Sequence, residues 1–168
     1  MDKRVIAIIF ILIIGGGCMF YAAYNSHTVG SAITTFSKTT ITLPPGFSVG
    51  STNDHTAELY NKNSPEKINI TDLGKNDSSL KEYEAAYAML SMDPSVKNIK
   101  NSTKTVQNST VYTLSYQAGD GMRYSSFLYA YDHVYCINMV GFNDTNKVNE
   151  TLDLIIETMH PDYKQSKD

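Results

Sequence analysis

Histidine is the side chain most often used for metal binding and for proton transfer near neutral pH. The chain contains four, His27, His55, His133 and His160. Their separations along the chain are far longer than the short spacing that brings two imidazoles to one ion from one element. Glycine motifs for phosphate or dinucleotide binding are also absent outside the N-terminal apolar segment. The sequence therefore predicts no metal site and no cofactor.

Five aspartates fall in segments with turn composition: Asp72, Asp77, Asp120, Asp132 and Asp144. In turns, Asp commonly accepts hydrogen bonds from the backbone nearby. No EF-hand spacing links these five, and no G-x-S-x-G nucleophile motif occurs. A non-catalytic protein is therefore the main prediction. Two alternatives remain, a calcium site in a loop and an envelope hydrolase whose site is assembled from these carboxylates.

The two cysteines lie in different settings. Cys136 belongs to an expected strand, where it is predicted to be a small buried hydrophobic residue and not a nucleophile. Cys18 lies in the apolar run VIAIIFILIIGGGCMFYAAY, so the two cannot form a disulfide with each other. Residues 15–17 are glycines and residues 19–24 remain apolar, a pattern unlike a lipoprotein signal. Cys18 is therefore expected to be an ordinary residue of the membrane-spanning helix, with lipidation as an alternative.

That apolar run covers residues 5–24 and contains no charge. As a helix it would be about 30 Å long, which matches the hydrocarbon core of a bilayer. Lys3 and Arg4 precede it, so the positive-inside rule places the N-terminus in the cytoplasm and the rest of the chain outside. A cleaved secretory signal and a pilin leader remain alternatives to this retained anchor.

The following organisation is predicted. Residues 1–4 are cytoplasmic, 5–24 form the transmembrane anchor, 25–36 are a tether or an entering strand, 37–162 form one extracytoplasmic domain, and 163–168 are a tail. The formal net charge is −3, and Arg4 and Arg123 are the only arginines, which argues against nucleic-acid binding. Six Asn-x-Ser/Thr sequons support an exported protein that could carry glycans. They begin at Asn69, Asn76, Asn101, Asn108, Asn143 and Asn149.

Alternation and turn signals predict strands along most of the remaining chain, and helical periodicity predicts two helices. The strands are expected near 41–43 and 47–49, in a hairpin of 57–63 with 67–74, and in a meander of 111–118, 122–131 and 134–141. One helix should begin at a capping box formed by Ser79 and Glu82 and end at Asp93-Pro94. The other should bury Val148, Leu152, Ile155, Ile156 and Met159 and end at His160-Pro161. Neither face of the meander is clearly polar, which indicates a sheet covered on both faces.

These elements predict an α+β domain, an antiparallel sheet flanked by helices and preceded by one transmembrane helix. Half of the twelve tyrosines lie between Tyr112 and Tyr135. They could stack on sugars or polymer, or they could simply pack beneath a helix. Arg123, beside the Asp120-Gly121 turn, is expected at an exposed strand end. Arg123 and Tyr124 are therefore the candidate ligand-binding residues.

Four segments resemble the PsbP-like (Mog1/PsbP/DcrB/LpqN) family of small α/β/α sandwiches, and in particular membrane-anchored members of archaeal envelopes. The segments are ITLPPGFSV (41–49), SLKEYEAAYAML (79–90), YSSFLYAYDHVYCINMVGF (124–142) and VNETLDLIIETM (148–159). Phe47 stands where the family usually has Trp. The likeness covers nearly all of the expected domain, but no catalytic motif defines the family, so no site residue transfers from it.

The resemblance implies an accessory or binding module at a membrane. The predicted function is therefore a membrane-anchored, non-catalytic binding module of the cell envelope. Its predicted partners are the lipid bilayer, through residues 5–24, and another envelope protein or a surface polymer. A pilin-like or surface-layer subunit is the structural alternative. The envelope hydrolase named above is the enzymatic one.

Overall fold

The computed structural model describes residues 33–75, 78–119 and 121–161. The expected anchor (5–24) with Cys18, most of the expected tether, the sequon at Asn76 and the tail lie outside these ranges. Within the described ranges, no helix is long and apolar enough to span a bilayer.

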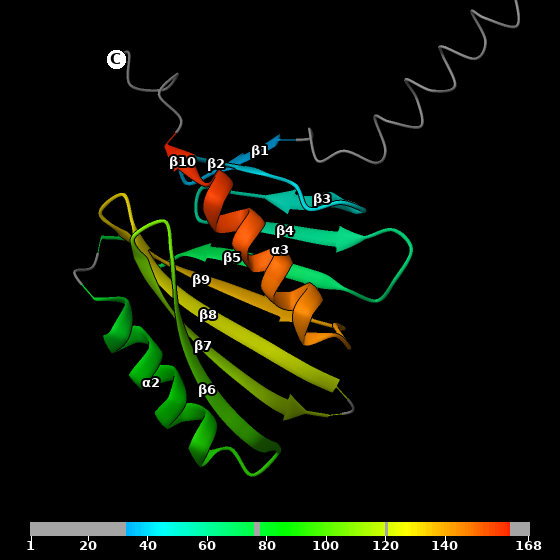
Figure 1. The fold of residues 1–168 in the computed structure, drawn as a ribbon, viewed down its shortest axis with the longest axis vertical. Helices are drawn as coiled ribbons and strands as arrows, with labels where there is room; N and C mark the ends of the chain where they lie inside the picture. The colour runs from blue at the N-terminus through cyan, green and yellow to red at the C-terminus, as the bar shows by residue number, and fades with distance from the viewer. Residues whose placement is uncertain (1–32, 76–77, 120, 162–168) are drawn as a thin grey trace, which may run out of the picture.

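The domain is built on a seven-stranded sheet in which every neighbouring pair is antiparallel (Figure 1). The strands are β3 (Phe47–Thr52), β4 (Thr56–Asn61), β5 (Lys67–Asp72), β6 (Val96–Val106), β7 (Ser109–Ala118), β8 (Gly121–Ala130) and β9 (His133–Val140). Their order across the sheet is β3-β4-β5-β9-β8-β7-β6. The predicted β4–β5 hairpin and the β7–β8–β9 meander are both confirmed.

A second, three-stranded sheet contains β1 (Ile33–Phe36), β2 (Thr39–Thr42) and the short β10 (His160–Pro161), in the order β1-β2-β10. Residues 33–36 pair with β2 along their whole length. They are therefore a strand of the domain, so the domain begins before residue 37, where the sequence placed its boundary. His160-Pro161 ends the preceding helix as predicted, and it also adds a short strand to β2.

The two predicted helices are present as α2 (Ser79–Met92) and α3 (Thr145–Thr158). The N-cap of α2 is Ser78, whose hydroxyl accepts a hydrogen bond from the Lys81 backbone N–H at 3.3 Å. The predicted cap at Ser79 is therefore wrong by one position, and Ser79 is instead a buried residue of the first turn. Asp144 caps α3 by accepting from the Asn146 N–H at 2.8 Å.

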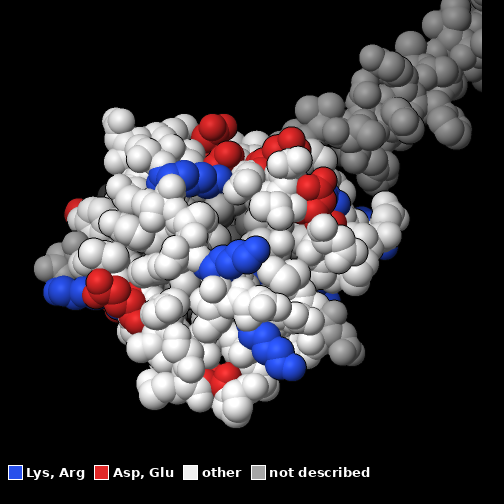
Figure 2. Space-filling view, turned by 60° about the horizontal axis from the view of Figure 1, so that its bottom comes forward, with Lys and Arg blue, Asp and Glu red and all other residues white. Residues whose placement is uncertain are grey.

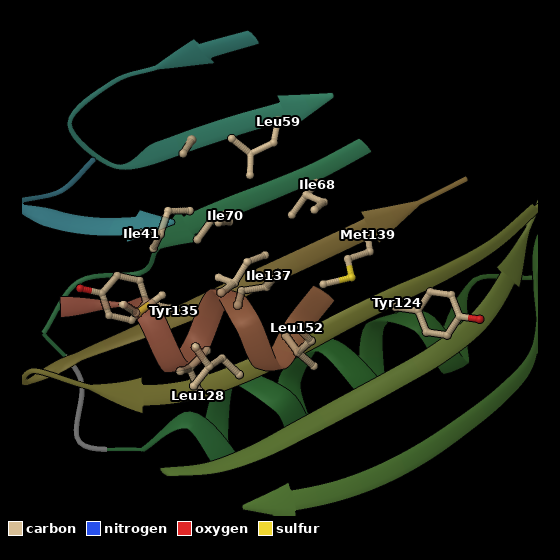
Figure 3. Packing of buried hydrophobic residues seen from close by; sticks show 14 of the residues in the cluster. Ile41, Leu59, Ile68, Ile70, Tyr124, Leu128, Tyr135, Ile137, Met139 and Leu152 are labelled. Atoms are coloured by element: carbon tan, nitrogen blue, oxygen red, sulfur yellow. The ribbon is translucent and has the colours of Figure 1, made fainter. Parts of the chain in front are cut away.

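The larger hydrophobic core lies between α3, the small sheet and one face of the main sheet (Figure 3). Helix α3 contributes Val148, Leu152, Ile155 and Ile156, four residues of the predicted stripe, and all are buried. Residues of β4, β5 and β9 meet them from the sheet, namely Leu59, Ile68, Ile70, Tyr135, Ile137 and Met139. We call this side of the sheet the α3 face.

A smaller core lies on the opposite side of the sheet, the α2 face. Leu114, Phe127 and Cys136 are its buried members, and Tyr83, Ala86 and Leu90 of α2 pack against them. Phe127 and Leu128 are consecutive in β8 but belong to different cores, because successive side chains of a strand point to opposite faces. The two helices therefore lie on opposite faces, and the predicted α+β arrangement of an antiparallel sheet with flanking helices is confirmed.

The sequence analysis did not predict β6, although it is the longest strand. Among the described strands it lies at the edge of the sheet and pairs with β7 alone, and most of its side chains are exposed. Of its eleven residues only Val106 is buried, so hydrophobic alternation does not mark it. Its lysines are typical of an edge that must not pair with another chain.

Candidate functional site

The two candidate ligand-binding residues of the sequence analysis point to opposite faces of the sheet. Tyr124 is 6% exposed and packs in the larger core on the α3 face. Arg123 is exposed on the α2 face, where its register partners are Tyr116 of β7 and Val140 of β9. The structure therefore does not bring the two together, and only Arg123 is available to a ligand.

The α2 face is only partly covered. Helix α2 packs on β6, β7 and β8, and Figure 1 shows it beside the β6–β7 end of the sheet, away from β3, β4 and β5. Over the other strands the same face forms a hollow of about 620 Å³. We call this surface the open face. It is defined by side chains of β4, β5 and β9, namely Glu58, Tyr60, Lys67, Asn69, Asn138 and Val140.

Register aligns one row of side chains across the open face and beyond it. From β4 to β7 the row runs Tyr60, Lys67, Val140, Arg123 and Tyr116. Neighbouring strands are about 4.8 Å apart, so the backbones at Lys67 and Arg123 are roughly 10 Å apart with Val140 between them. Among the described residues neither cation has an ion pair or a side-chain hydrogen bond. We call this row the cationic row.

The neighbouring row on the same face is polar and uncharged apart from Glu58. It continues through Asn69 and Asn138 to Ser125. The Ser125 hydroxyl donates to the Asn138 side-chain oxygen at 2.7 Å and lies 3.4 Å from the Tyr116 hydroxyl. Glu58 accepts from the Ser51 hydroxyl at 3.0 Å. This second row therefore supplies hydrogen-bonding groups next to the two cations.

One edge of the hollow is held by a buried carboxylate. Both oxygens of Glu66 accept from the Lys147 ammonium, at 2.5 and 2.7 Å, and one also accepts from Ser64 and Asn61. Burial alone would raise the pKa of Glu66, but the hydrogen bonds from Lys147, Ser64 and Asn61 and the charge of Lys147 outweigh it, so the pKa lies below 4.5. Glu66 is thus a structural anion.

The chemistry that this surface favours is binding of an anionic group beside a flat ring. Lysine and arginine form charge-assisted hydrogen bonds to carboxylates, phosphates and sulfates. Tyr60, 41% exposed, presents an aromatic ring at one end of the cationic row. On the face shown in Figure 2, basic side chains are separated from one another, some of them beside acidic residues, and do not form a continuous basic patch.

Nucleophile and metal chemistry receive no support from the described residues. Burial raises the pKa of the Cys136 thiol to about 11, although a hydrogen bond with Asn138 partly opposes it, so the thiolate is scarce near neutral pH. No group of three His, Cys, Asp or Glu side chains in the described ranges could hold a metal ion.

The turn aspartates have local partners. Asp72 is bound by His133 and Ser37, Asp132 accepts from the Tyr129 hydroxyl at 3.1 Å, and Asp144 caps α3. Asp77 and Asp120 lie outside the described ranges. No hydrogen bond joins any two of these three described aspartates.

The sequons fall in different environments. Four of the asparagines are exposed: Asn101 on β6, Asn108 in the β6–β7 turn, Asn143 before α3 and Asn149 on α3. Asn69 is half-buried in β5, which is paired on both sides, and its side-chain oxygen accepts from the Thr71 hydroxyl at 2.9 Å. The exposed four are the sterically accessible positions for glycans.

Sequence reasoning identified Arg123 but missed its companions Tyr60 and Lys67. The signal was present in KINITD (67–72), where apolar and polar residues alternate and place Lys67, Asn69 and Thr71 on one face. The sequence could not show how much of the sheet α2 covers, and therefore could not show that these strands are left uncovered.

Comparison with known proteins gives structural likeness without a match in sequence. No protein-family profile matches the sequence, and no curated protein matches it. The solution structure of cyanobacterial PsbP (CyanoP) from Synechocystis sp. PCC 6803 is similar, with a TM-score of 0.45 and 11% sequence identity, covering 74% of this chain and 87% of that chain. At that distance no property of the cyanobacterial protein is transferred to this chain.

Proposed function

We propose that the protein is a membrane-anchored, extracytoplasmic binding module whose open face holds an extended anionic polymer of the cell surface. In this proposal residues 5–24 span the membrane, the N-terminus is cytoplasmic, and the domain that begins near Ile33 lies outside. The sequence supports this topology through the charge-free run and the preceding Lys3 and Arg4. The sequence resemblance to membrane-anchored PsbP-like proteins of archaeal envelopes agrees with it.

The observation that carries the proposal is the cationic row. Lys67 and Arg123 lie on one exposed face, on either side of Val140, with Tyr60 and Tyr116 beyond them. An uncovered sheet face is usually a solvated face with scattered charges. Here two cations that have no charged partner among the described residues are in register between Tyr60 and Tyr116, of which Tyr116 also packs against the smaller core. Amide and hydroxyl groups form the neighbouring surface. A linear polymer with regularly spaced acidic groups and sugar rings whose C–H faces can stack on an aromatic side chain complements that arrangement.

The test uses the full chain, purified from its native membrane and placed in nanodiscs of zwitterionic lipid. An intact mass that retains residues 1–24 without lipid on Cys18 supports the anchor. Polygalacturonate is the anionic probe and neutral dextran its control, with binding followed by biolayer interferometry. We expect saturable, salt-sensitive binding of polygalacturonate and none of dextran, because salt screens exposed charges over about 10 Å.

The decisive variant is Lys67→Ala combined with Arg123→Ala. Losing two charge-assisted contacts should weaken binding about tenfold or more, since 1.4 kcal/mol corresponds to a factor of ten. The matched control is Lys97→Ala with Lys100→Ala, which removes the same charge from β6. These two lysines pair with Gln117 and Ser115 and so belong to the other face of the sheet. Equal losses in both double variants would overturn the open face as the binding site.

A further inference from the structure

A second hollow, of about 830 Å³, lies at one end of the sheet and is separate from the open face. Four chain segments enclose it: the β1–β2 turn, the β3–β4 turn, the segment after β5 and the start of β9. We call it the end cleft. We propose that the end cleft is a binding site for a small oxyanion, such as phosphate or the phosphate group of a larger ligand.

Basic and neutral donor groups converge on the end cleft from distant parts of the sequence. Lys38, His55, Lys75 and His133 come one from each of the four segments. Among the described residues that line the cleft, the one carboxylate is that of Asp54, which is exposed. Two lysines and two imidazoles thus line the cleft, whereas the Ser37 hydroxyl donates to the buried Asp72 carboxylate beneath it. Lysine ammonium groups form charge-assisted hydrogen bonds with phosphate oxygens.

A buried carboxylate below the cleft fixes the His133 ring and the Ser37 side chain. The Asp72 side chain is 1% exposed, and one of its oxygens lies 2.7 Å from His133 Nδ1. The same carboxylate accepts from the Ser37 hydroxyl and, at 2.7 Å, from the Gly74 backbone N–H. With Nδ1 held by Asp72, Nε2 is the ring nitrogen of His133 that remains for a ligand, and it donates to an oxyanion when both ring nitrogens carry a proton. Asp72 also joins the β1–β2 turn to the main sheet, so the cleft is already formed without a ligand.

The backbone conformation of the β1–β2 turn is unfavourable for a lysine. Ser37 and Lys38 have φ angles of 47° and 57°, which makes the turn a two-residue hairpin loop of the kind that favours Asn-Gly. The left-handed conformation costs an ordinary L-residue roughly 1–2 kcal/mol. The same left-handed pair occurs in the two-residue turns 107–108 and 131–132, so it is a hairpin geometry of this fold, and here it places Ser37 and Lys38 at the rim of the cleft.

The test titrates inorganic phosphate into the full chain in nanodiscs of zwitterionic lipid, with chloride as the control anion. NMR signals of the four histidine rings report binding at constant pH. We expect saturable shifts of the His55 and His133 ring signals with phosphate, no saturable shift with chloride, and no shift of His27. Phosphate titrations that leave His55 and His133 unchanged would overturn the proposal.

Variants then locate the site. Lys38→Ala with Lys75→Ala should raise the dissociation constant for phosphate about tenfold or more, because both lysines are exposed and their loss leaves the fold intact. The double variant Lys67→Ala with Arg123→Ala removes the same charge from the open face and should change it by less than about twofold. Equal weakening in both would show nonspecific attraction of phosphate to exposed positive side chains and would also overturn the proposal.

Discussion

The two faces of the seven-stranded sheet are made by the same strands, yet α3 and the small sheet cover one of them and α2 covers only part of the other. In β5 the contrast occurs between neighbours: Ile68 and Ile70 are 1% and 0% exposed, whereas Lys67 is exposed and Asn69 half-buried. The α3 face therefore provides the hydrophobic stabilisation of this half of the domain. The side chains of the open face contribute little to folding and are available for contact with another molecule.

Because of this difference, adjacent residues of one strand should contribute differently, one to the stability of the fold and its neighbour to binding. A residue on the α3 face excludes water from a packed core, so truncating it removes transfer free energy and leaves a cavity. A residue on the open face already contacts water, so truncating it removes mainly a contact that it could make with a ligand. Substitutions of adjacent residues in one strand can therefore test the comparison directly.

The largest effect is expected for Leu59→Ala in β4, with Tyr60→Ala as its neighbour on the other face. Leu59 is 2% exposed in the larger core, and its truncation should lower the free energy of unfolding by about 2–5 kcal/mol. Tyr60 is 41% exposed, and its truncation should cost less than about 1 kcal/mol. Urea denaturation followed by circular dichroism measures both.

The binding assay should give the opposite order for the same two variants. Tyr60→Ala should weaken binding of polygalacturonate, and Leu59→Ala, measured where it remains folded, should not. If Tyr60→Ala destabilises the domain as much as Leu59→Ala, the open face is part of the packed structure and the contrast between the two faces fails.

Much of the fold was predictable because its signals are local. The stripe of Val148, Leu152, Ile155 and Ile156 marks α3, and the Asp120-Gly121 pair marks the β7–β8 hairpin, although Asp120 itself lies outside the described ranges. β6 was missed because an exposed edge strand does not need alternating apolar and polar residues. The cap of α2 was placed one residue late because Ser78 and Ser79 are both suitable caps, and only backbone geometry distinguishes them.

The candidate site was less predictable, because it depends on register between strands distant in the sequence. Arg123 was identifiable as the only arginine after residue 4. Its alignment with Lys67 requires the pairing of β5 with β9, and these strands are separated by α2, β6, β7 and β8 along the chain. Tyr124 was predicted to share a binding site with Arg123 because the two are adjacent in sequence. Adjacent residues of a strand, however, point their side chains to opposite faces of the sheet.

The next effect concerns the edge of the open face, where Gly141 lies against the β4–β5 turn. Gly141 has φ +80°, and a Cβ there would lie 2.5 Å from the carbonyl oxygen of Pro65. We expect Gly141→Ala to lower the free energy of unfolding by about 2–3 kcal/mol, through backbone strain and this clash. Gly119→Ala is the matched control, because Gly119 also has positive φ (+61°) but has open space around its Cβ position.

Gly119→Ala should cost only the strain, about 1 kcal/mol. Thermal unfolding of both variants gives the comparison. Equal destabilisation by the two substitutions would mean that the β4–β5 turn moves freely away from Gly141, and the edge of the open face would then not be rigidly held.

The smallest effect tests whether that edge is fixed by charge, and it depends on pH. The pKa of Glu66 is lowered in the folded protein, so its contribution to stability is complete above about pH 4.5, the usual value for the unfolded chain, and is lost as the pH falls through the lowered folded value. Glu66→Gln should therefore cost about 1 kcal/mol at pH 7, and the gap to wild type should close as the pH falls below 4.5. Urea denaturation from pH 3 to 7 measures the gap.

Lys147→Met keeps the hydrogen bonds from Ser64 and Asn61 and should show an intermediate pH dependence. A Glu66→Gln curve parallel to wild type at every pH would show that Glu66 acts through its shape alone. In that case the edge of the open face would depend on packing, as the α3 face does.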